Sequence, residues 1–263
     1  MSDTIRTKKI RLSLDGPLAW VTLDRPDKLN ALDREMLEGL ETASTLIDRN
    51  DRVRVALLTG AGDRAFCVGA DINAWSELEP LDMWRRWTRD GQRLFDCIAQ
   101  LRVPVIAVLN GYAFGGGLEL ALSADLRIAA DDAALALPEA TIGTVPGWAG
   151  TRRLPRLIGP ARAKEMIFSG ERVDARKAER WGLVNEVVPR ARLMHKAAEI
   201  ADRIAENAPI PVQIAKQLVN TAVGEAQPST IESVAGGLAA MTDDAQEGLV
   251  AFRERRPPRF SGR

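Results

Sequence analysis

The chain has 263 residues, 46% of them hydrophobic, which fits one α/β domain or, as we favour, a core with a helical appendage. Its 36 basic and 36 acidic residues balance, which excludes a global field that would recruit nucleic acid or an anionic membrane. Two cysteines and one histidine are too few for a disulfide framework and give no closely spaced metal ligands, so we expect a reducing compartment and no metal site.

The first six residues lack an apolar signal core, and no apolar run in the sequence approaches membrane-spanning length. We therefore expect a soluble cytoplasmic protein without a membrane partner.

The N-terminal part of the sequence predicts a hairpin, a helix and a strand, in that order. Residues 10–23 alternate in polarity around an Asp-Gly-Pro turn and predict a hairpin. Asp33 is a suitable N-cap for an amphipathic helix over residues 36–47. Residues 53–59 predict a strand, and residues 60–72 a long loop of small residues that makes close contacts.

A tryptophan-rich helix is predicted over residues 81–101. The cluster of Trp75, Trp84 and Trp87 is compatible with a ligand pocket. An aromatic stripe at helical spacing is nevertheless more typical of a hydrophobic core, which is the interpretation we favour.

Residues 110–125 are the stretch around which the rest of the chain is organised. They follow an apolar run, residues 103–109, that predicts a strand covered on both faces. Three glycines at 115–117 allow close approach of the backbone, and the helix that begins there points unpaired N–H groups outward with a partial positive charge. Glu119 falls in the first turn of this helix among apolar residues, where it either complements the helix dipole or acts as an acid/base residue.

Two nucleotide-binding motifs with a similar strand–glycine–helix pattern do not fit. A Rossmann fingerprint has the pattern G-x-G-x-x-G or G-x-G-x-x-A. Counted from Gly115 and Gly117, its last position is occupied by Leu120. A P-loop needs Lys and then Ser or Thr after its last glycine, whereas Leu118 and Glu119 follow here. The glycines therefore favour a neutral acceptor that gains charge during a reaction, as in an oxyanion hole.

The remainder of the chain changes from strands to helices. Residues 125–130 and 134–137 predict short strands, and the second leads directly into Pro138-Glu139. A stretch broken by glycine and proline follows. Helices are then predicted over residues 161–168, 175–181, 190–206 and 211–223, with a strand at 184–188. We therefore divide the chain into a strand-bearing core, residues 1–195, and a helical region, residues 196–263.

Among the side chains that could act in catalysis, carboxylates are the candidates that remain. His195, the one histidine, lies in a polar turn of a predicted helix and far in sequence from the glycine-rich turns that mark the expected site. Ser-His-Asp or Cys-His chemistry is therefore not favoured. Glu119 and Glu139 each stand at the edge of a glycine-bearing turn with apolar neighbours. Two such carboxylates can divide the roles of general base and general acid.

Five segments together resemble the enoyl-CoA hydratase/isomerase (crotonase) superfamily in order and spacing. They are residues 25–32, 69–72, 110–125, 138–147 and 251–256. The resemblance implies an α/β fold in which ββα units wind into a spiral, with C-terminal helices that assemble homotrimers, often paired into hexamers. It also implies an acyl-CoA thioester substrate of fatty acid and lipid metabolism, with no cofactor beyond the coenzyme A of the substrate.

The resemblance also assigns roles to individual positions. The N–H groups of Ala70 and Gly116 would form the oxyanion hole for the thioester carbonyl. The coenzyme A site would comprise Lys28, Asn30 and Ala31 at the nucleotide end, Ala70, Asp71, Ile72 and Asn73 along the pantetheine and thioester, and Gly116 and Gly147 beside them. Arg255 replaces a lysine common in the family's tail, which a neighbouring subunit can offer to the ribose phosphate.

The reaction implied is hydration, because both glutamates of the family's hydratases are present. Glu119 would activate water for attack at Cβ, and Glu139 would supply the proton to Cα, as expected of a hydro-lyase. Isomerases of the family typically use one carboxylate at the Glu139 position. A dehydratase acting on a special hydroxyacyl-CoA, an isomerase, a decarboxylase, a thioester hydrolase and a non-catalytic acyl-CoA-binding homologue are the alternatives.

One departure from the family concerns the acyl end of the site. The family commonly has small residues after Pro146-Gly147, whereas this chain has Trp148. The indole would either narrow or reshape the acyl pocket or turn outward into packing. Trp87 and Trp148 are the candidate acyl-pocket residues.

Overall fold

The structure is a computed structural model that describes residues 3–7, 9–225 and 228–263. It divides into two compact units, Met1–Gln213 and Ile214–Arg263. The boundary expected from the sequence, between residues 195 and 196, falls inside a helix of the first unit and stays a prediction.

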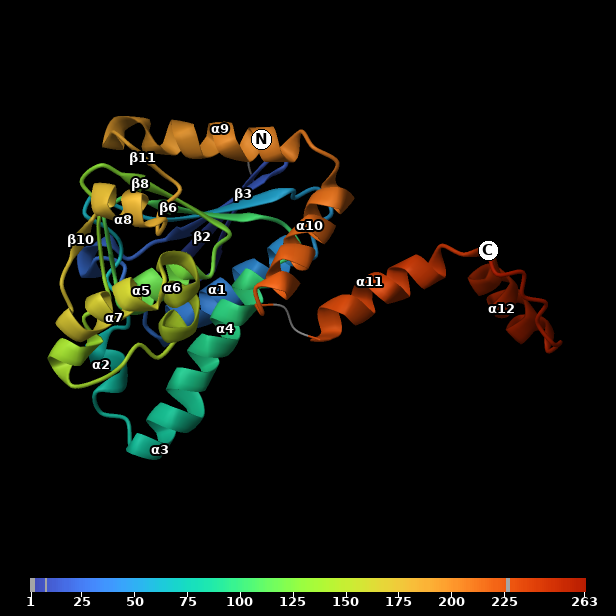
Figure 1. The fold of residues 1–263 in the computed structure, drawn as a ribbon, viewed down its shortest axis with the longest axis horizontal. Coiled ribbons are helices and arrows are strands. Elements are labelled where there is room, and N and C mark those ends of the chain that lie inside the picture. Colours follow the sequence, from blue (N-terminus) through green and yellow to red (C-terminus); the bar gives the residue numbers. More distant parts are fainter. Residues whose placement is uncertain (1–2, 8, 226–227) are drawn as a thin grey trace. The chain divides into compact units, whose positions relative to one another are not determined.

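A seven-stranded sheet forms the centre of the first unit (Figure 1). Its strands, in spatial order, are β1 (Asp3–Thr7), β2 (Ile10–Asp15), β3 (Leu18–Leu23), β4 (Val55–Gly60), β6 (Val105–Leu109), β8 (Leu126–Ala130) and β11 (Glu186–Val188). The first three strands pair antiparallel, which confirms the predicted hairpin, and the others continue in parallel from β3. Every residue of β4 and β6 is buried, as expected for parallel strands covered on both faces.

A smaller sheet contains β10 (Val173–Asp174), β9 (Ala134–Ala136), β7 (Tyr112–Phe114) and β5 (Ala65–Cys67), in that order. Strands β5, β7 and β9 are parallel, and each directly follows a strand of the large sheet along the chain. The chain therefore repeats one pattern: a strand in each sheet, then a helix. This is the ββα spiral implied by the resemblance. Strand β5 lies inside the predicted loop of residues 60–72, and β7 lies in residues 110–125, where sequence patterns predict no strand.

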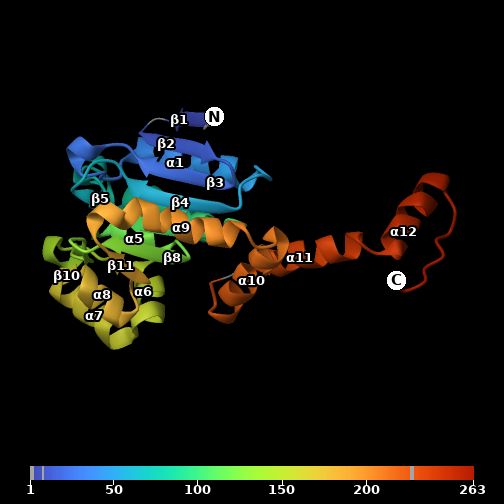
Figure 2. The same ribbon diagram turned by 90° about the horizontal axis from the view of Figure 1, so that it is seen from above.

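Helices cover both faces of the large sheet. Helix α9 (Leu193–Ala205) packs against β3, β4, β6 and β8 on one face, while α1 (Arg34–Asp48) packs against β1, β2 and β3 on the other (Figures 1 and 2). Asp33 caps α1 as predicted, because its carboxylate accepts the N–H of Met36 at 2.9 Å. His195 lies on α9 and is exposed.

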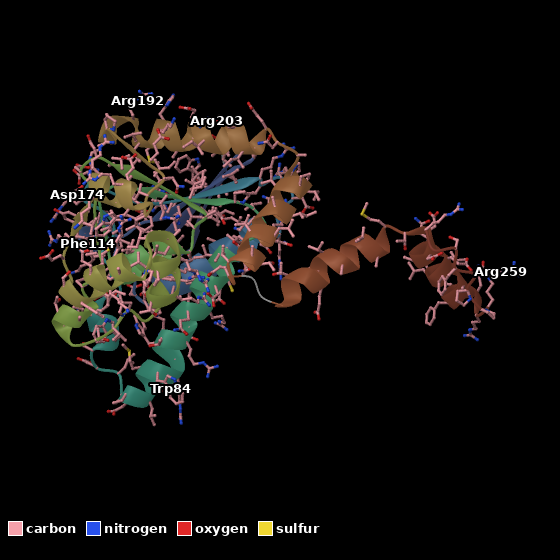
Figure 3. The ribbon with its side chains drawn as sticks, viewed as in Figure 1. Trp84, Phe114, Asp174, Arg192, Arg203 and Arg259 are labelled. Carbon is pink, nitrogen blue, oxygen red and sulfur yellow. The ribbon has the colours of Figure 1, made fainter. Side chains whose placement is uncertain are left out.

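The tryptophan-rich helix departs from regular geometry. It comprises α3 (Pro80–Asp82), a π-helical segment (Met83–Thr88) and α4 (Arg89–Ala99). A π-helical turn shifts side chains relative to α-helical spacing. Trp87 is 4% exposed, as a core residue would be, but Trp84 is 61% exposed and lies near the start of this helix (Figure 3). The core interpretation is therefore wrong for Trp84.

The remaining elements of the first unit are short. They are the 3-10 helices Pro26–Lys28, Glu139–Ile142 and Arg190–Arg192, and the helices α2 (Ile72–Trp75), α5 (Gly116–Leu122), α6 (Gly150–Ile158), α7 (Pro160–Ser169) and α8 (Ala175–Trp181). Gly182 ends α8 with a left-handed conformation, as predicted.

The C-terminal unit is helical. Helix α10 (Pro209–Ala222) leads into it, and α11 (Pro228–Ala240) and α12 (Asp243–Glu254) follow. Large apolar side chains are exposed on these helices and the tail, among them Leu238, Met241, Leu249, Phe252 and Phe260. None of the helices in the described ranges is long and apolar enough to cross a membrane.

Candidate active site

Three consecutive repeats place their loops at one edge of the small sheet. The loop after β5 carries Ala70, the turn after β7 carries Gly116, and the turn after β9 carries Glu139. Because these strands are parallel, their carboxyl ends meet at the same edge. Residues far apart in sequence therefore converge there.

Two backbone N–H groups, those of Ala70 and Gly116, lie next to each other. Ideal Cβ atoms built on Gly69 and Gly116 would lie 3.2 Å from the Gly116 nitrogen and 3.5 Å from the Ala70 nitrogen, respectively. Gly115 permits this turn because its φ of 52° with ψ of −129° is a conformation that residues with a Cβ rarely adopt. Within the described residues, neither N–H donates a hydrogen bond to a protein acceptor. The pair can therefore bind an oxygen that gains negative charge.

Glu119 is buried in the first turn of α5. It is 2% exposed, and its Oε1 accepts the N–H groups of Trp148 at 2.8 Å and Gly150 at 2.7 Å. Burial raises its pKa to about 7, the bond from Gly150 opposes this shift, and the nearby Glu139 carboxylate adds to it. The turn at residues 147–150 thus fixes the direction of a carboxyl group that titrates near neutral pH.

Glu139 begins the 3-10 helix after β9 and lies beside the same glycine turn. Its Oε1 lies 3.0 Å from the ideal Cβ position of Gly115. Its Oε2 is buried and has no hydrogen-bond partner in the described part of the chain. Burial raises the pKa of this carboxyl as well. A buried oxygen without a donor favours the protonated form, so Glu139 is suited to donate a proton.

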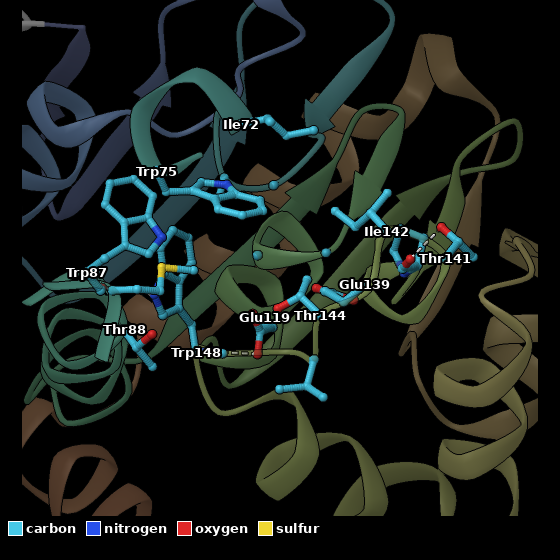
Figure 4. Close-up of a pocket in the computed structure, with 18 of the residues that line it drawn as sticks. Ile72, Trp75, Trp87, Thr88, Glu119, Glu139, Thr141, Ile142, Thr144 and Trp148 are labelled. Carbon is cyan, nitrogen blue, oxygen red and sulfur yellow. Dashed lines mark hydrogen bonds between the residues drawn. The ribbon is translucent and has the colours of Figure 1, made fainter. Parts of the chain in front are cut away.

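Both glutamates line one cavity of about 460 Å³, together with Ala70 and Gly116 (Figure 4). Apolar side chains form most of its wall: Val68, Ile72, Trp75, Pro80, Met83, Trp84, Trp87, Ile142, Val145 and Trp148. In Figure 4, Trp75, Trp87 and Trp148 lie on one side of the glutamates, and Ile142 and Thr141 lie on the other. The cavity therefore joins a small polar reaction site to an apolar chamber, as a ligand with a reactive polar group and an apolar chain requires.

Trp148 lies inside the protein, 3% exposed, and part of it lines the cavity. Its ring packs 5.5 Å from that of Trp87 and 5.3 Å from that of Phe95, between centroids. Its Nε1 donates to the carbonyl of Trp87 at 3.3 Å. The indole therefore does not turn outward to the surface: it packs inward and part of it lines the cavity, which favours the acyl-pocket alternative, and its effect on acyl selection stays a prediction.

The residues expected to hold coenzyme A lie in several settings. Lys28 and Asn73 are exposed, Ala31 is half-buried, and Ile72 and Gly147 line the cavity. Asn30 is fully buried, and its Nδ2 donates to the carbonyls of Ala61 and Ala65 at 3.0 Å each, so its side chain holds neighbouring loops together and is not available to a ligand. Arg255 ends α12 in the C-terminal unit, exposed and with a φ of 54°.

Sequence patterns did not reveal several residues of this cavity. Met83, Thr88, Ile142 and Val145 were not expected in it, and Trp75 and Trp84 were assigned to the core. An available signal was the presence of two apolar residues, Ile142 and Val145, in a stretch broken by glycine and proline, and the structure leaves both exposed. No group of three or more potential metal ligands occurs among the residues that the structure describes.

Comparison with known proteins agrees with this architecture. The chain belongs to the enoyl-CoA hydratase/isomerase family, whose model matches residues 15–263. It is 39% identical over 247 residues to the short-chain-enoyl-CoA hydratase of Clostridium acetobutylicum, covering 93% of this chain and 94% of the relative. It is 38% identical over 265 residues to the carnitinyl-CoA dehydratase of Proteus mirabilis, covering 98% and 100%. The crystal structure of the Bacillus anthracis enoyl-CoA hydratase superposes with a TM-score of 0.81 at 39% identity, covering 97% of this chain and 100% of that one.

Proposed function

We propose that the protein is an enoyl-CoA hydratase, a hydro-lyase that adds water reversibly across the 2,3 double bond of a 2-enoyl-CoA thioester. One observation carries the proposal: the buried carboxyl group of Glu119 and the carboxyl group of Glu139, whose Oε2 is buried, line the same cavity as two adjacent N–H groups that have no protein acceptor among the described residues. The similarity to a short-chain-enoyl-CoA hydratase over nearly the whole chain supports the same reaction.

The chemistry follows from these positions. The N–H groups of Ala70 and Gly116 bind the thioester oxygen, and a water molecule lies between the two carboxyl groups. Glu119 takes a proton from the water as its oxygen attacks Cβ, and the electrons of the double bond move onto the thioester oxygen. Glu139 then gives its proton to Cα, which completes the addition of one water molecule. Proton exchange restores both glutamates.

The environments of the glutamates support this division of roles. The backbone N–H groups that bind Oε1 of Glu119 favour its ionised form, which a base needs. Oε2 of Glu139 lacks a donor within the described residues, which favours the protonated form that an acid needs. The two carboxyl groups interact, so their apparent pKa values belong to the pair.

The substrate's coenzyme A would be held at the surface beside this cavity, and no further cofactor is required. Lys28 is exposed and can meet a phosphate at the nucleotide end, beside Asn30 and Ala31, while Ala70, Asp71, Ile72 and Asn73 would follow the pantetheine towards the thioester, with Gly147 beside them. We further propose homotrimers or paired trimers, in which Arg255 of a neighbouring subunit contacts the nucleotide, and a cytoplasmic role in lipid metabolism. The exposed apolar residues of the C-terminal helices support assembly.

A dehydratase acting on a hydroxyacyl-CoA is the second candidate. The same two carboxyl groups catalyse the reverse reaction, and the similarity to a carnitinyl-CoA dehydratase supports it. Isomerisation, decarboxylation, thioester hydrolysis and non-catalytic binding would not need two carboxyl groups withdrawn from solvent around one water molecule.

The test is the absorbance of the conjugated thioester in a panel of 2-enoyl-CoA substrates of different chain length and branching, with identification of the products. Hydration predicts loss of this absorbance and formation of a 3-hydroxyacyl-CoA. A 3-enoyl-CoA, a free acid with coenzyme A, or no product at all would contradict the proposal and identify an alternative.

A further inference from the structure

Arg25 links two loops without lining the cavity. It follows β3, and its side chain is 17% exposed. Its Nη1 donates to Oδ2 of Asp71 at 2.7 Å and to the carbonyl of Ala31 at 3.0 Å. One guanidinium group therefore joins the loop that follows β3 to the loop that presents Ala70.

Asp71 is fixed on every side. Its N–H donates to the carbonyl of Leu32 at 2.8 Å, and its Oδ1 accepts the N–H of Asn73 at 3.1 Å, which caps α2. Burial would raise its pKa, but the bonds from Arg25 and Asn73 hold the pKa of this carboxyl below its ordinary value, so it remains ionised. The aspartate next to Ala70 thus carries a permanent charge that Arg25 balances.

The direction of the Ala70 N–H depends on the same two loops. This N–H shares one planar peptide group with the carbonyl of Gly69, and the two point in opposite directions. The Gly69 carbonyl accepts the N–H of Leu32 at 2.7 Å, and Leu32 directly follows Ala31. A shift of residues 31–32 relative to residues 69–71 would therefore rotate the Ala70 N–H away from the position proposed for the thioester oxygen.

The neighbouring charges leave Arg25 available for Asp71. Asp33 lies 3.5 Å from Nη1 of Arg25, but it also pairs with Lys9, which lies 3.0 Å from Glu35 as well. The Lys9 ammonium therefore balances much of the Asp33 charge. The shorter and less exposed contact of Arg25 is the one with Asp71.

We propose that Arg25 and Asp71 are positioning residues for catalysis: their ion pair locks residues 31–32 against residues 69–71 and so aims the Ala70 N–H at the thioester carbonyl. This role differs from the one expected from the sequence, where Asp71 binds the substrate and Arg25 has no role in the site. The proposal rests on the proposed function. An N–H held in place before the reaction stabilises developing charge without reorganisation. Small misplacements of such groups cost much of their effect.

The test uses Asp71→Asn, Arg25→Met, the double variant and Arg25→Lys. Asn keeps the shape and can still accept the Asn73 N–H, so Asp71→Asn removes mainly the charge. We expect kcat to fall about 10- to 100-fold in each single variant, with KM for the thioester nearly unchanged. The double variant should lose no more than a single one, because the pair acts as a unit. Arg25→Lys should recover part of the activity.

A spectroscopic measurement separates this proposal from the proposed function. The infrared carbonyl stretch of bound butanoyl-CoA, a saturated thioester that cannot be hydrated, reports hydrogen bonding to its oxygen. In Asp71→Asn and Arg25→Met this band should move towards its frequency in water, whether or not the wild type proves to be a hydratase. The matched control is Lys177→Met, which removes an exposed ion pair with Glu165 at 3.4 Å and should change neither readout.

Two results would overturn the role of the pair. One is wild-type kcat in the double variant. The other is loss of kcat with the carbonyl band unmoved, which would indicate a different defect. Thermal melting of each variant checks that the fold is intact, and the isosteric Asp71→Asn variant carries the test if Arg25→Met unfolds.

Discussion

An ideal Cβ atom on Gly91 would lie 2.1 Å from Nε1 of Trp148, so the indole occupies the space that any other residue at position 91 would need. The opposite part of the same ring covers Gly116, whose ideal Cβ would lie 2.7 Å from Cε3 and Cζ3. Two glycines on separate helices, α4 and α5, therefore create the slot for one tryptophan. The ring in this slot lies against the proposed oxyanion donor.

The first prediction concerns Gly91. Alanine normally stabilises a helix by about 1 kcal/mol relative to glycine. Gly91→Ala should instead lower the melting temperature and the activity, because the new methyl group would displace the indole. Thr42→Ala, on the exposed face of α1, is the control and should be neutral or slightly stabilising. Combining Gly91→Ala with Trp148→Leu should restore part of the lost stability; strictly additive losses would show that the two positions do not share this slot.

The second prediction concerns the acyl chain. Trp148→Ala opens space beside Gly116 at the apolar end of the cavity. The variant should accept bulkier acyl groups, with discrimination changing by about 1–3 kcal/mol in kcat/KM across the substrate panel. Identical acyl preferences in the wild type and the variant would limit the indole to a packing role.

The third prediction concerns the two glutamates. Glu119→Gln and Glu139→Gln preserve shape and polarity but remove an acid/base group. Each should reduce kcat for hydration by about 10²- to 10⁴-fold with little change in thioester binding. An isomerase that relies on Glu139 alone would tolerate Glu119→Gln and continue to exchange α-protons. Near-wild-type hydration by Glu119→Gln would refute the two-carboxylate mechanism.

The fourth prediction is a pH dependence. Burial raises the pKa of Glu119 from its ordinary value of 4.5 to about 7, and Glu119 acts as a base only when ionised. The kcat/KM of the wild type should therefore rise with pH up to about 7 and fall about tenfold per pH unit below it. Because the glutamates are coupled, the midpoint belongs to the pair. An acidic limb with its midpoint near the ordinary glutamate value would contradict this assignment, as would an unchanged limb in Glu119→Gln.

The fifth prediction concerns the nucleotide end of the substrate. Lys28→Ala should raise KM for coenzyme A thioesters while kcat is largely retained, because an exposed cation contributes to binding but not to chemistry. Added salt should weaken binding of the wild type more than that of the variant. Lys164→Ala, an exposed lysine on α7, is the control. An unchanged KM in Lys28→Ala would remove Lys28 from the binding site.

The sequence by itself determined the longer strands and helices and the set of reactive side chains. Period-two and helical patterns predicted the β2–β3 hairpin, the capped helix α1 and the buried strand β6, because such patterns record which side of a local element faces the core. The scarcity of histidine and cysteine left Glu119 and Glu139 as reactive candidates. The five segments that resemble the family implied the ββα spiral, a fold that no local sequence pattern specifies.

Only the tertiary structure decided which residues meet. The strands β5 and β7 are three residues long each and carry no periodic signal of their own, yet their parallel alignment brings Ala70 next to Gly116. The glycines at 116 and 117 proved necessary for contacts within the protein, since an ideal Cβ on Gly117 would lie 2.1 Å from the carbonyl oxygen of Cys67. Likewise, the inward position of Trp148 depends on the missing side chain of Gly91, 57 positions earlier in the numbering. Such contacts depend on the three-dimensional path of the backbone between distant segments, and residue type and spacing along the chain do not contain that path.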